Sequence, residues 1–272
     1  MNSWITDSET ALAKRAAAFI TATAYRAVAD RGRFTLVLSG GKTPKRVYEQ
    51  LALGLRKGLL EKSGYSRPLS LHYPAQGDEA ITLPWAETFV FQGDERYVPT
   101  GHPDSNYGMV SRTLMVKGGV RKENLFRMPV ESGEPEADAL RYEEQIRAFF
   151  RKGLGAANSD FPSFDLVLLG LGDDGHTASL FPGERKALDE RKRWVIAVDA
   201  PGANPPCSRL TLSLPVINHA RSVMFLVPAG RYELARSIHD GNRPDLPAGM
   251  VNPLHGQARW FVAEPSPQLL HP

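Results

Sequence analysis

Polar, glycine-containing turns follow three apolar segments of this sequence, and their residue types are those that bind anions and transfer protons. The turns lie at 39–44, 92–96 and 170–176. Each preceding apolar segment has the character of a buried strand. In an open parallel sheet, ligands bind beyond the carboxyl ends of the strands. The sequence therefore predicts that the three turns form one shared site.

The first turn matches only part of a nucleotide-binding loop. Gly41-Lys42-Thr43 agrees with the end of the P-loop pattern, but Leu36 stands where that pattern requires its first glycine. The Ser-Gly-Gly turn still presents backbone N–H groups at the start of an expected helix, which favours an anion such as a single phosphate group. The alternative is an ordinary strand-to-helix turn.

The third turn matches the dinucleotide-binding pattern G-x-G-x-x-G, and Asp199 lies near the position of a ribose-binding acid. Asp173 and Asp174, however, would place two carboxylates beside the pyrophosphate. Like charges repel strongly in a partly desolvated site. The sequence therefore favours another function for this turn.

His176 is the candidate general base. We expect it in the first turn of a following helix, where the helix dipole opposes protonation and favours the neutral imidazole. A neutral imidazole in a crevice can accept a proton, and Asp174 could orient its ring or hold a water molecule. The alternative is that His176 only caps or packs at the helix start. The glycine-rich turn, the flanking acids and the nearby anion site favour catalysis.

In the middle turn, Asp94, Glu95 and Arg96 alternate in charge. Arg96 can bind a carboxylate or a phosphate through its planar set of donors, or it can form an internal ion pair with a neighbouring acid. The following Ser105-Asn106 either caps a helix or supports the crevice. The histidines show no metal-ligand spacing and the chain has no G-x-S-x-G elbow, so we expect neither a metal site nor a serine hydrolase.

The elements that position these turns follow from hydrophobic periodicity and turn residues. Strands are expected at 34–38, 88–91, 164–169, 194–198, 210–212, 222–227 and 258–262. Helices are expected at 7–30, 43–57, 105–115, 137–151 and 231–239, the second capped by Thr43 with Pro44 at its first position. Strands without alternation, separated by helices, predict an α/β fold with a mostly parallel sheet covered on both faces. We expect one domain over 1–272, with a long loop or insertion at 63–84.

The bulk composition is that of a globular protein. The chain has 272 residues, of which 42% are hydrophobic and 23% charged. The net charge of +3 suits an anionic small molecule and is too weak to indicate nucleic acid. The single cysteine, Cys207, excludes an internal disulfide. We find neither a signal peptide nor a membrane-spanning run, so a cytoplasmic protein, acting as a monomer without nucleic acid or membrane partners, is expected.

The three turns together resemble the motifs of the 6-phosphogluconolactonases. These motifs are SGGKTP, FQGDERYVP followed by DSNYG, and FDLVLLGLGDDGHTASLFPG. RLTLSLPVINHARSVMFLV and PAGMVNPLHGQARWFV extend the resemblance over nearly the whole chain except 63–84. The related glucosamine-6-phosphate deaminases share the fold and a DGH turn but typically continue as IAFNEP. This chain continues as TASLFP, which favours the lactonase.

The resemblance implies a three-layer α/β sandwich that hydrolyses 6-phospho-D-glucono-1,5-lactone to 6-phospho-D-gluconate in the pentose phosphate pathway, without a metal or organic cofactor. It implies that His176 activates water for attack on the lactone carbonyl, with Asp174 at its side. It also implies that Arg96 binds the substrate and stabilises developing negative charge. The expected substrate-binding residues are Ser39, Gly40, Gly41, Lys42, Thr43, Asp94, Arg209 and Arg231.

Two positions depart from the family pattern. Asn204-Pro205-Pro206 replaces the usual K-P-P, and Gly230-Arg231 carries an arginine, shifted in position, where a G-x-x-K lysine is common. Arginine keeps the charge but not the geometry of lysine, and Lys42 or Arg231 could supply the missing cation. Two other functions stay open: a sugar-phosphate deaminase or isomerase with Asp94 or Asp174 as its base, and a non-catalytic sugar-phosphate-binding protein.

Overall fold

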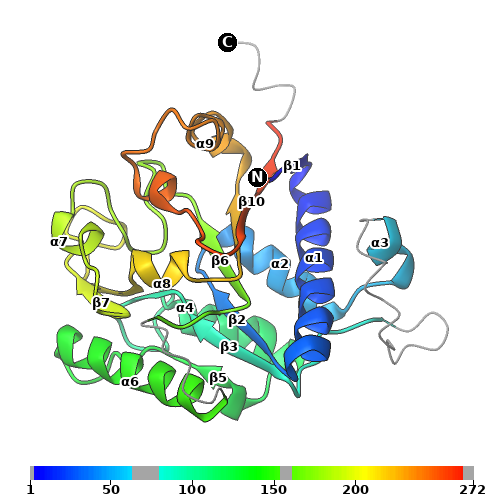
Figure 1. Cartoon of the computed structure of the whole chain (residues 1–272), viewed down its shortest axis with the longest axis horizontal. Helices are drawn as coiled ribbons and strands as arrows, with labels where there is room; N and C mark the ends of the chain where they lie inside the picture. The colour runs from blue at the N-terminus through cyan, green and yellow to red at the C-terminus, as the bar shows by residue number, and fades with distance from the viewer. Residues whose placement is uncertain (1–2, 63–79, 154–160, 266–272) are drawn as a thin grey trace.

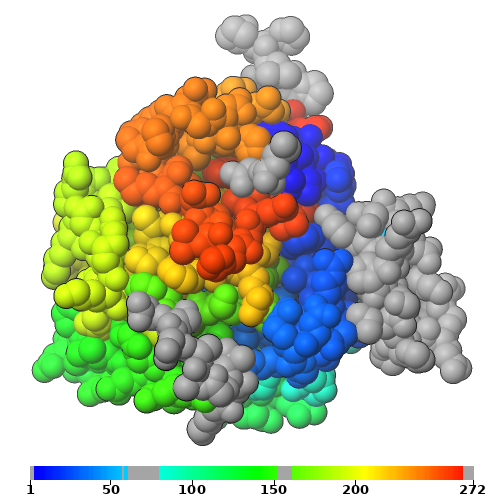
Figure 2. Space-filling view, viewed as in Figure 1, coloured from blue at the N-terminus to red at the C-terminus, as the bar shows by residue number. Residues whose placement is uncertain are grey.

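A central sheet of seven strands, all paired in parallel, organises the computed structural model, which describes residues 3–62, 80–153 and 161–265. The strand order is β1-β10-β9-β6-β2-β3-β5 (Figure 1). In chain order the strands are β1 Ser3–Asp7, β2 Phe34–Leu38, β3 Thr88–Gln92, β5 Leu125–Phe126, β6 Leu166–Gly170, β9 Ser222–Val227 and β10 Gln257–Ala263. The first strand, β1, was not predicted. It pairs with β10, so the two ends of the described chain lie side by side (Figure 2).

Helices cover both faces of the sheet, as the unbroken apolar strands predicted. Successive strand residues point to opposite faces: Leu36 and Leu168 pack with α1 and α2, whereas Val37 and Leu169 pack with α6, α8 and α9. Figure 1 shows α1 and α6 on opposite sides of the sheet. These helices are α1 Glu9–Arg31, α2 Lys42–Leu53, α6 Pro135–Gly153, α8 Leu214–Asn218 and α9 Tyr232–His239. The three-layer α/β prediction is confirmed.

A small antiparallel sheet, which was not predicted, lies outside the central one. Its order is β4-β8-β7, with β4 Asp94–Arg96, β7 Val195–Val198 and β8 Arg209–Leu212. Strands at 194–198 and 210–212 were expected, but their antiparallel pairing was not. The chain leaves the central sheet at Gly93, whose N–H donates to the carbonyl of Leu38 and whose carbonyl accepts from the N–H of Leu212. This branch point brings β8 beside the middle turn.

Helix boundaries differ from the expected ones where glycine or local irregularity intervenes. α2 begins at Lys42 with Gly41 as its N-cap, so the expected cap at Thr43 is wrong and Pro44 lies at the third position. α2 ends at Leu53 because Gly54 has a φ of 74°. The helix expected to run to 57 is therefore shorter, and α3 Lys57–Lys62 is separate.

The helical region after the middle turn is divided. It comprises α4 Asn106–Val110, a π-helical turn Ser111–Met115 and α5 Val116–Gly118. Ser105 caps α4, since its hydroxyl accepts from the N–H of Gly108 at 3.0 Å. Of the two residues Ser105-Asn106, the serine thus makes the helix cap.

Most of the segment expected as a loop or insertion, 63–84, lies outside the described residues. Its described end is part of the core: Ile81 and Leu83 are buried with α1 and α2, and Ile81 pairs with Leu55 through backbone hydrogen bonds. None of the helices in the described ranges combines the length and apolar character needed to cross a bilayer.

Candidate active site

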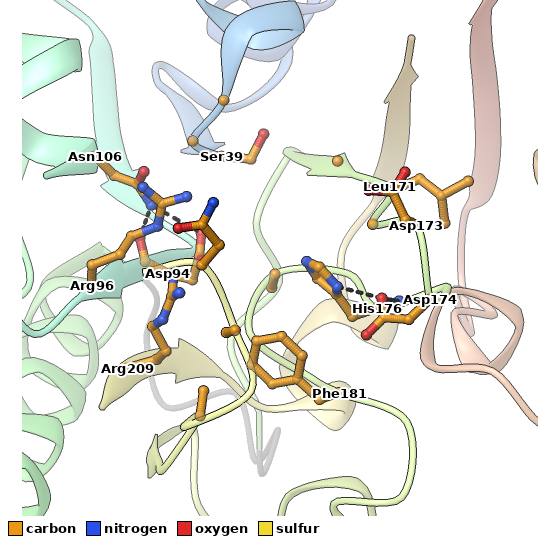
Figure 3. A pocket seen from close by; sticks show the side chains of 18 of the residues that line it. Ser39, Asp94, Arg96, Asn106, Leu171, Asp173, Asp174, His176, Phe181 and Arg209 are labelled. Atoms are coloured by element: carbon orange, nitrogen blue, oxygen red, sulfur yellow. Dashed lines mark hydrogen bonds and ion pairs between the residues drawn. The ribbon is translucent and has the colours of Figure 1, made fainter. Parts of the chain in front are cut away.

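One cavity of about 720 Å³ lies where the three predicted turns meet, and its volume is typical of a small-molecule site. It lies at the carboxyl ends of β2, β3 and β6 (Figure 3). Every residue expected in the site lines it. These residues are Ser39, Gly40, Gly41, Lys42, Thr43, Asp94, Arg96, Asp174, His176, Arg209 and Arg231.

The first turn is held in place by close packing. A Cβ on Gly40 would overlap the Asn106 amide, and Gly41 has a φ of 106°, so both positions require glycine. The buried hydroxyl of Tyr48 accepts from the Ser39 N–H at 3.0 Å and donates to the Ser39 carbonyl at 2.8 Å. The Ser39 N–H is therefore occupied. The Ser39 hydroxyl is buried and has no hydrogen-bond partner among the described residues.

The N-terminus of α2 opens on the cavity. No side chain in the described part of the chain caps it, and Lys42 and Thr43 in its first turn line the cavity. Unpaired N–H groups and the helix dipole favour an anion at such a terminus. Lys42 adds a positive charge. This part of the site suits a phosphate group.

Arg96 and Arg209 face each other across the β4–β8 ladder. Arg96 Nη1 donates to the carbonyl of Asp104 at 2.7 Å, and Arg209 Nη2 donates to that of Pro205 at 2.8 Å. The Nε atom of each is buried without a partner, and within 3–62, 80–153 and 161–265 no carboxylate forms an ion pair with either. The internal ion pair considered for Arg96 is therefore absent there.

Two like charges placed opposite each other on a ladder are destabilising. Burial and the neighbouring Arg96 lower the pKa of Arg209, which is 4% exposed. A bound anion would relieve the repulsion and give the two buried Nε groups an acceptor. The pair therefore has the chemistry of an anion site.

Asp94 lines the same cavity but is bound by neutral donors. Its Oδ2 accepts from the Ser179 hydroxyl at 2.8 Å, and its Oδ1 accepts from the Asn106 amide at 3.3 Å. The dashed lines in Figure 3 mark the contact with Asn106. Ser179 follows the His176 turn, so this carboxylate joins the middle and third turns.

Glu95 is a buried carboxylate that supports the site from behind. It accepts from the backbone N–H groups of Arg96, Asn106 and Tyr107 and from the Gln92 amide. Burial raises its pKa, although these hydrogen bonds act in the opposite direction. Glu95 thereby holds the N-terminus of α4 and places Asn106 in the cavity. The DER and DSN segments were both noted in the sequence. Their spacing did not indicate that Glu95 would bind the backbone of Asn106.

His176 does not lie in a helix, so the helix-dipole argument for its neutral form is wrong. Residues 171–180 form tight turns, in which the Gly172 N–H donates to the His176 carbonyl at 2.9 Å. Gly175 has a φ of 84° and Ala178 a φ of 50°. Left-handed conformations at these two positions interrupt a right-handed helix.

The His176 ring is fixed on three sides. Asp174 Oδ1 lies 2.5 Å from Nδ1 and also accepts from the His176 N–H at 3.0 Å. The Phe181 ring packs at a centroid distance of 4.8 Å, and a Cβ on Gly172 would overlap the imidazole. Figure 3 shows the ring between Asp174 and the open cavity. With the proton on Nδ1 toward the carboxylate, Nε2 is an acceptor that faces the cavity.

Arg231 is neutralised by Asp173 at the rim. Arg231 Nε lies 2.7 Å from Asp173 Oδ1, and Nη2 donates to Oδ2 at 2.9 Å. The hydrogen bond from Arg231 lowers the pKa of Asp173. Asn204, at the position where the family has lysine, also lines the cavity. Asp173 therefore offsets the charge with which Arg231 could replace that lysine.

Two cofactor interpretations receive no support from the geometry. The G-x-G-x-x-G segment is not followed by a helix whose N-terminus could hold a pyrophosphate, and Leu246 packs against Gly175. Within the described ranges, no group of three or more histidine, cysteine or acidic side chains is arranged to hold a metal ion.

Known proteins of one family are similar to this chain over most of its length. The family model "Glucosamine-6-phosphate isomerases/6-phosphogluconolactonase" matches residues 7–260. The 6-phosphogluconolactonase of Synechocystis sp. is 36% identical over 264 residues, which cover 96% of this chain and 95% of that protein. That of Nostoc sp. is 35% identical over 257 residues, covering 93% and 92%.

The solved structure of 6-phosphogluconolactonase from Trypanosoma brucei is similar with a TM-score of 0.72 and 25% identity. The similarity covers 97% of this chain and 96% of that one. The fold, the family model and the full-length relatives agree, and the chain belongs to the glucosamine-6-phosphate isomerase/6-phosphogluconolactonase family.

Proposed function

We propose that this protein hydrolyses 6-phospho-D-glucono-1,5-lactone to 6-phospho-D-gluconate in the pentose phosphate pathway. One observation carries the proposal: a histidine–aspartate pair shares a cavity with two arginines that have no carboxylate partner in the described chain. Full-length relatives that are named 6-phosphogluconolactonases support it. A cytoplasmic location and a monomeric state stay predictions from the sequence.

The substrate phosphate binds at the N-terminus of α2. The first-turn N–H groups, the Ser39 hydroxyl and the Lys42 ammonium contact it, and Thr43 lines the same end of the cavity. Such an anchor, remote from the reacting carbonyl, lets binding energy position the lactone for attack. Arg209 provides a second, buried cation for the substrate.

His176 acts as the general base. Its Nε2 accepts a proton from a water molecule, and the oxygen of that water forms a bond to the lactone carbonyl carbon. Asp174 holds the ring through Nδ1 and stabilises the imidazolium that forms. Arg96 donates to the oxyanion of the tetrahedral intermediate. Collapse of the intermediate breaks the bond to the ring oxygen, which takes the proton from His176, and the new acid ionises.

The test is the initial rate of lactone loss, corrected for spontaneous hydrolysis. We expect the protein to accelerate it and to produce 6-phosphogluconate. Binding of 6-phosphogluconate without acceleration would indicate a non-catalytic sugar-phosphate-binding protein. Release of ammonia from glucosamine 6-phosphate would instead indicate a deaminase, a class that this fold also includes.

A further inference from the structure

Asp94 lies on the same face of β4 as Arg96, since the two residues are two positions apart in a strand. Arg209 is directly opposite Arg96, and Thr211 is opposite Asp94. All three ionisable side chains line one cavity, and both Asp94 and Arg209 are less than one-tenth exposed. Even so, Asp94 forms no ion pair with either guanidinium, and its oxygens are bound by neutral groups.

Ser179 makes the shorter of the two side-chain hydrogen bonds to the Asp94 carboxylate. Its hydroxyl donates to Asp94 Oδ2 at 2.8 Å, and the serine is 1% exposed. Its own N–H donates to the Thr211 hydroxyl at 3.3 Å, so Ser179 is fixed to the strand opposite Asp94. It lies in the turn that follows His176. The residue therefore connects the turn of the candidate base to the ladder that carries both arginines.

Asn106 holds the other carboxylate oxygen. Its amide donates to Asp94 Oδ1 at 3.3 Å and to the Asp94 carbonyl at 3.0 Å. The Asn106 N–H is bound to Glu95, and its side chain packs against Gly40. Asn106 itself lines the cavity, whereas Ser179 does not. A substitution of Ser179 therefore removes a hydrogen bond to Asp94 without removing a side chain from the cavity wall.

The Asp94 carboxylate and an anionic ligand could compete for Arg96 and Arg209. A carboxylate and a guanidinium attract strongly where water is excluded. If Asp94 turned onto Arg96 or Arg209, an anionic ligand would have to displace it before binding. Neutral donors on both Asp94 oxygens satisfy the carboxylate without an ion pair to either guanidinium, although its charge still favours the protonated form of Arg209.

We propose that Ser179 is a positioning residue that holds the Asp94 carboxylate off the Arg96–Arg209 pair and so keeps this pair open to an anionic group of the ligand. The identity of that ligand rests on the proposed function. Ser179 is buried and does not line the cavity. It acts through Asp94, and its effect must therefore depend on the charge of Asp94.

A double-mutant cycle tests this dependence, with the dissociation constant of 6-phosphogluconate measured by calorimetry. The variants are Ser179→Ala, Asp94→Asn and the combination of both. We expect Ser179→Ala to weaken binding about tenfold in the presence of Asp94, and less than about twofold in the Asp94→Asn background. An uncharged asparagine competes only weakly with an anion for the two guanidiniums, so removal of the Ser179 hydroxyl has little left to change.

Ser213→Ala is the matched control. Ser213 follows β8, is fully buried and donates to the Arg193 carbonyl at 2.7 Å, away from the cavity. It should change the melting temperature about as much as Ser179→Ala and leave the dissociation constant unchanged. Equal weakening by Ser179→Ala with and without the Asp94→Asn substitution, or no weakening in either background, would overturn the inference.

The outcome for the wild type separates this inference from the proposed function. If the wild type does not bind 6-phosphogluconate, the proposed function fails, and the same cycle is measured with inorganic phosphate. A coupling that persists with phosphate supports the positioning role independently of the sugar. If phosphate does not bind, or binds without coupling to Ser179 and Asp94 as a phosphate held only at the N-terminus of α2 would, the inference fails.

Discussion

Asp165 and Asp94 are buried carboxylates near opposite ends of the strands of the central sheet. Asp165 forms ion pairs with the arginines beside it, whereas Asp94 does not. Asp165 lies just before β6 and is 5% exposed. Its Oδ1 is 2.9 Å from Arg31 Nη2 and 3.6 Å from Arg221 Nε, and its Oδ2 accepts two hydrogen bonds from Thr35. At this end of the sheet, Asp165 forms ion pairs with both of the arginines beside it.

At the carboxyl end, the charges are kept apart. Asp94 is bound by Ser179 and Asn106, whereas Arg96 and Arg209 face each other with buried, unpaired Nε atoms. Unpaired buried cations cost stability, and such groups concentrate at functional sites. The same residue types form ion pairs at one end of the sheet, whereas at the other end they leave two guanidiniums without a carboxylate partner in the described chain, as an anion site would require.

The largest effect should come from His176→Ala. Loss of the general base should reduce kcat about 10²–10⁴-fold, with little change in the melting temperature because one third of the His176 side chain is exposed. The assay is the corrected rate of lactone loss. His102→Ala is a matched control, since His102 is a more exposed histidine that also contacts an aspartate, outside the cavity. A variant that kept the wild-type rate would exclude His176 as the base.

Arg209→Met should separate activity from stability. We expect kcat/KM to fall about 10²-fold, as for the loss of a buried charged contact to an anionic ligand. Urea unfolding should show equal or higher stability, because the repulsion with Arg96 disappears. Arg31→Met is the counterpart at the other end, and it should lower stability while leaving kcat/KM unchanged. If Arg209→Met were less stable than the wild type, Arg209 would stabilise the fold as Arg31 does, and the difference between the two ends of the sheet would not hold.

Asp165→Asn should lower stability and leave activity unchanged, the reverse of Arg209→Met. The asparagine cannot satisfy both Arg31 and Thr35 as the carboxylate does, and we expect the free energy of unfolding to fall by about 1–3 kcal/mol. Kinetic constants measured well below the melting temperature should stay at their wild-type values. A substantial change in KM would show that this end of the sheet also influences the cavity.

The smallest effects concern the pH dependence of stability. Burial would raise the pKa of Glu143, but hydrogen bonds from Arg193, Trp194 and Arg147 outweigh it and lower the pKa. Its stabilisation is therefore complete above the unfolded pKa of about 4.3 and is lost as the pH falls through the lower folded pKa. Glu143→Gln should be less stable at neutral pH and should lose less stability on acidification.

Glu95, behind the cavity, should show the opposite sign. Burial raises its pKa, so the folded protein holds this proton more tightly than the unfolded chain. The resulting stabilisation is present below about pH 4.3 and is lost as the pH rises through the raised folded pKa. Urea midpoints of Glu95→Gln and Glu143→Gln across this range should deviate from the wild type with opposite slopes. Parallel slopes would contradict the assigned directions.

The convergence of the three turns could be predicted because the carboxyl ends of parallel strands share one edge. The placement of His176 in a helix failed for a local reason. The polar D-D-G-H segment was interpreted as a helix start, but Gly175 and Ala178 adopt left-handed conformations there. Leu246, distant in sequence, packs against Gly175, and the sequence pattern does not show that contact.

The α/β class, the three turns and the residue types that line the cavity could be predicted from the amino-acid sequence, because periodicity and turn chemistry act over a few neighbouring residues. Which charged side chains pair with one another could be seen only in the folded protein. Asp94 and Ser179 are 85 positions apart, and Arg31 and Asp165 are 134 apart. Such pairs depend on strand register and on the branch at Gly93, which are set by packing across the whole sheet.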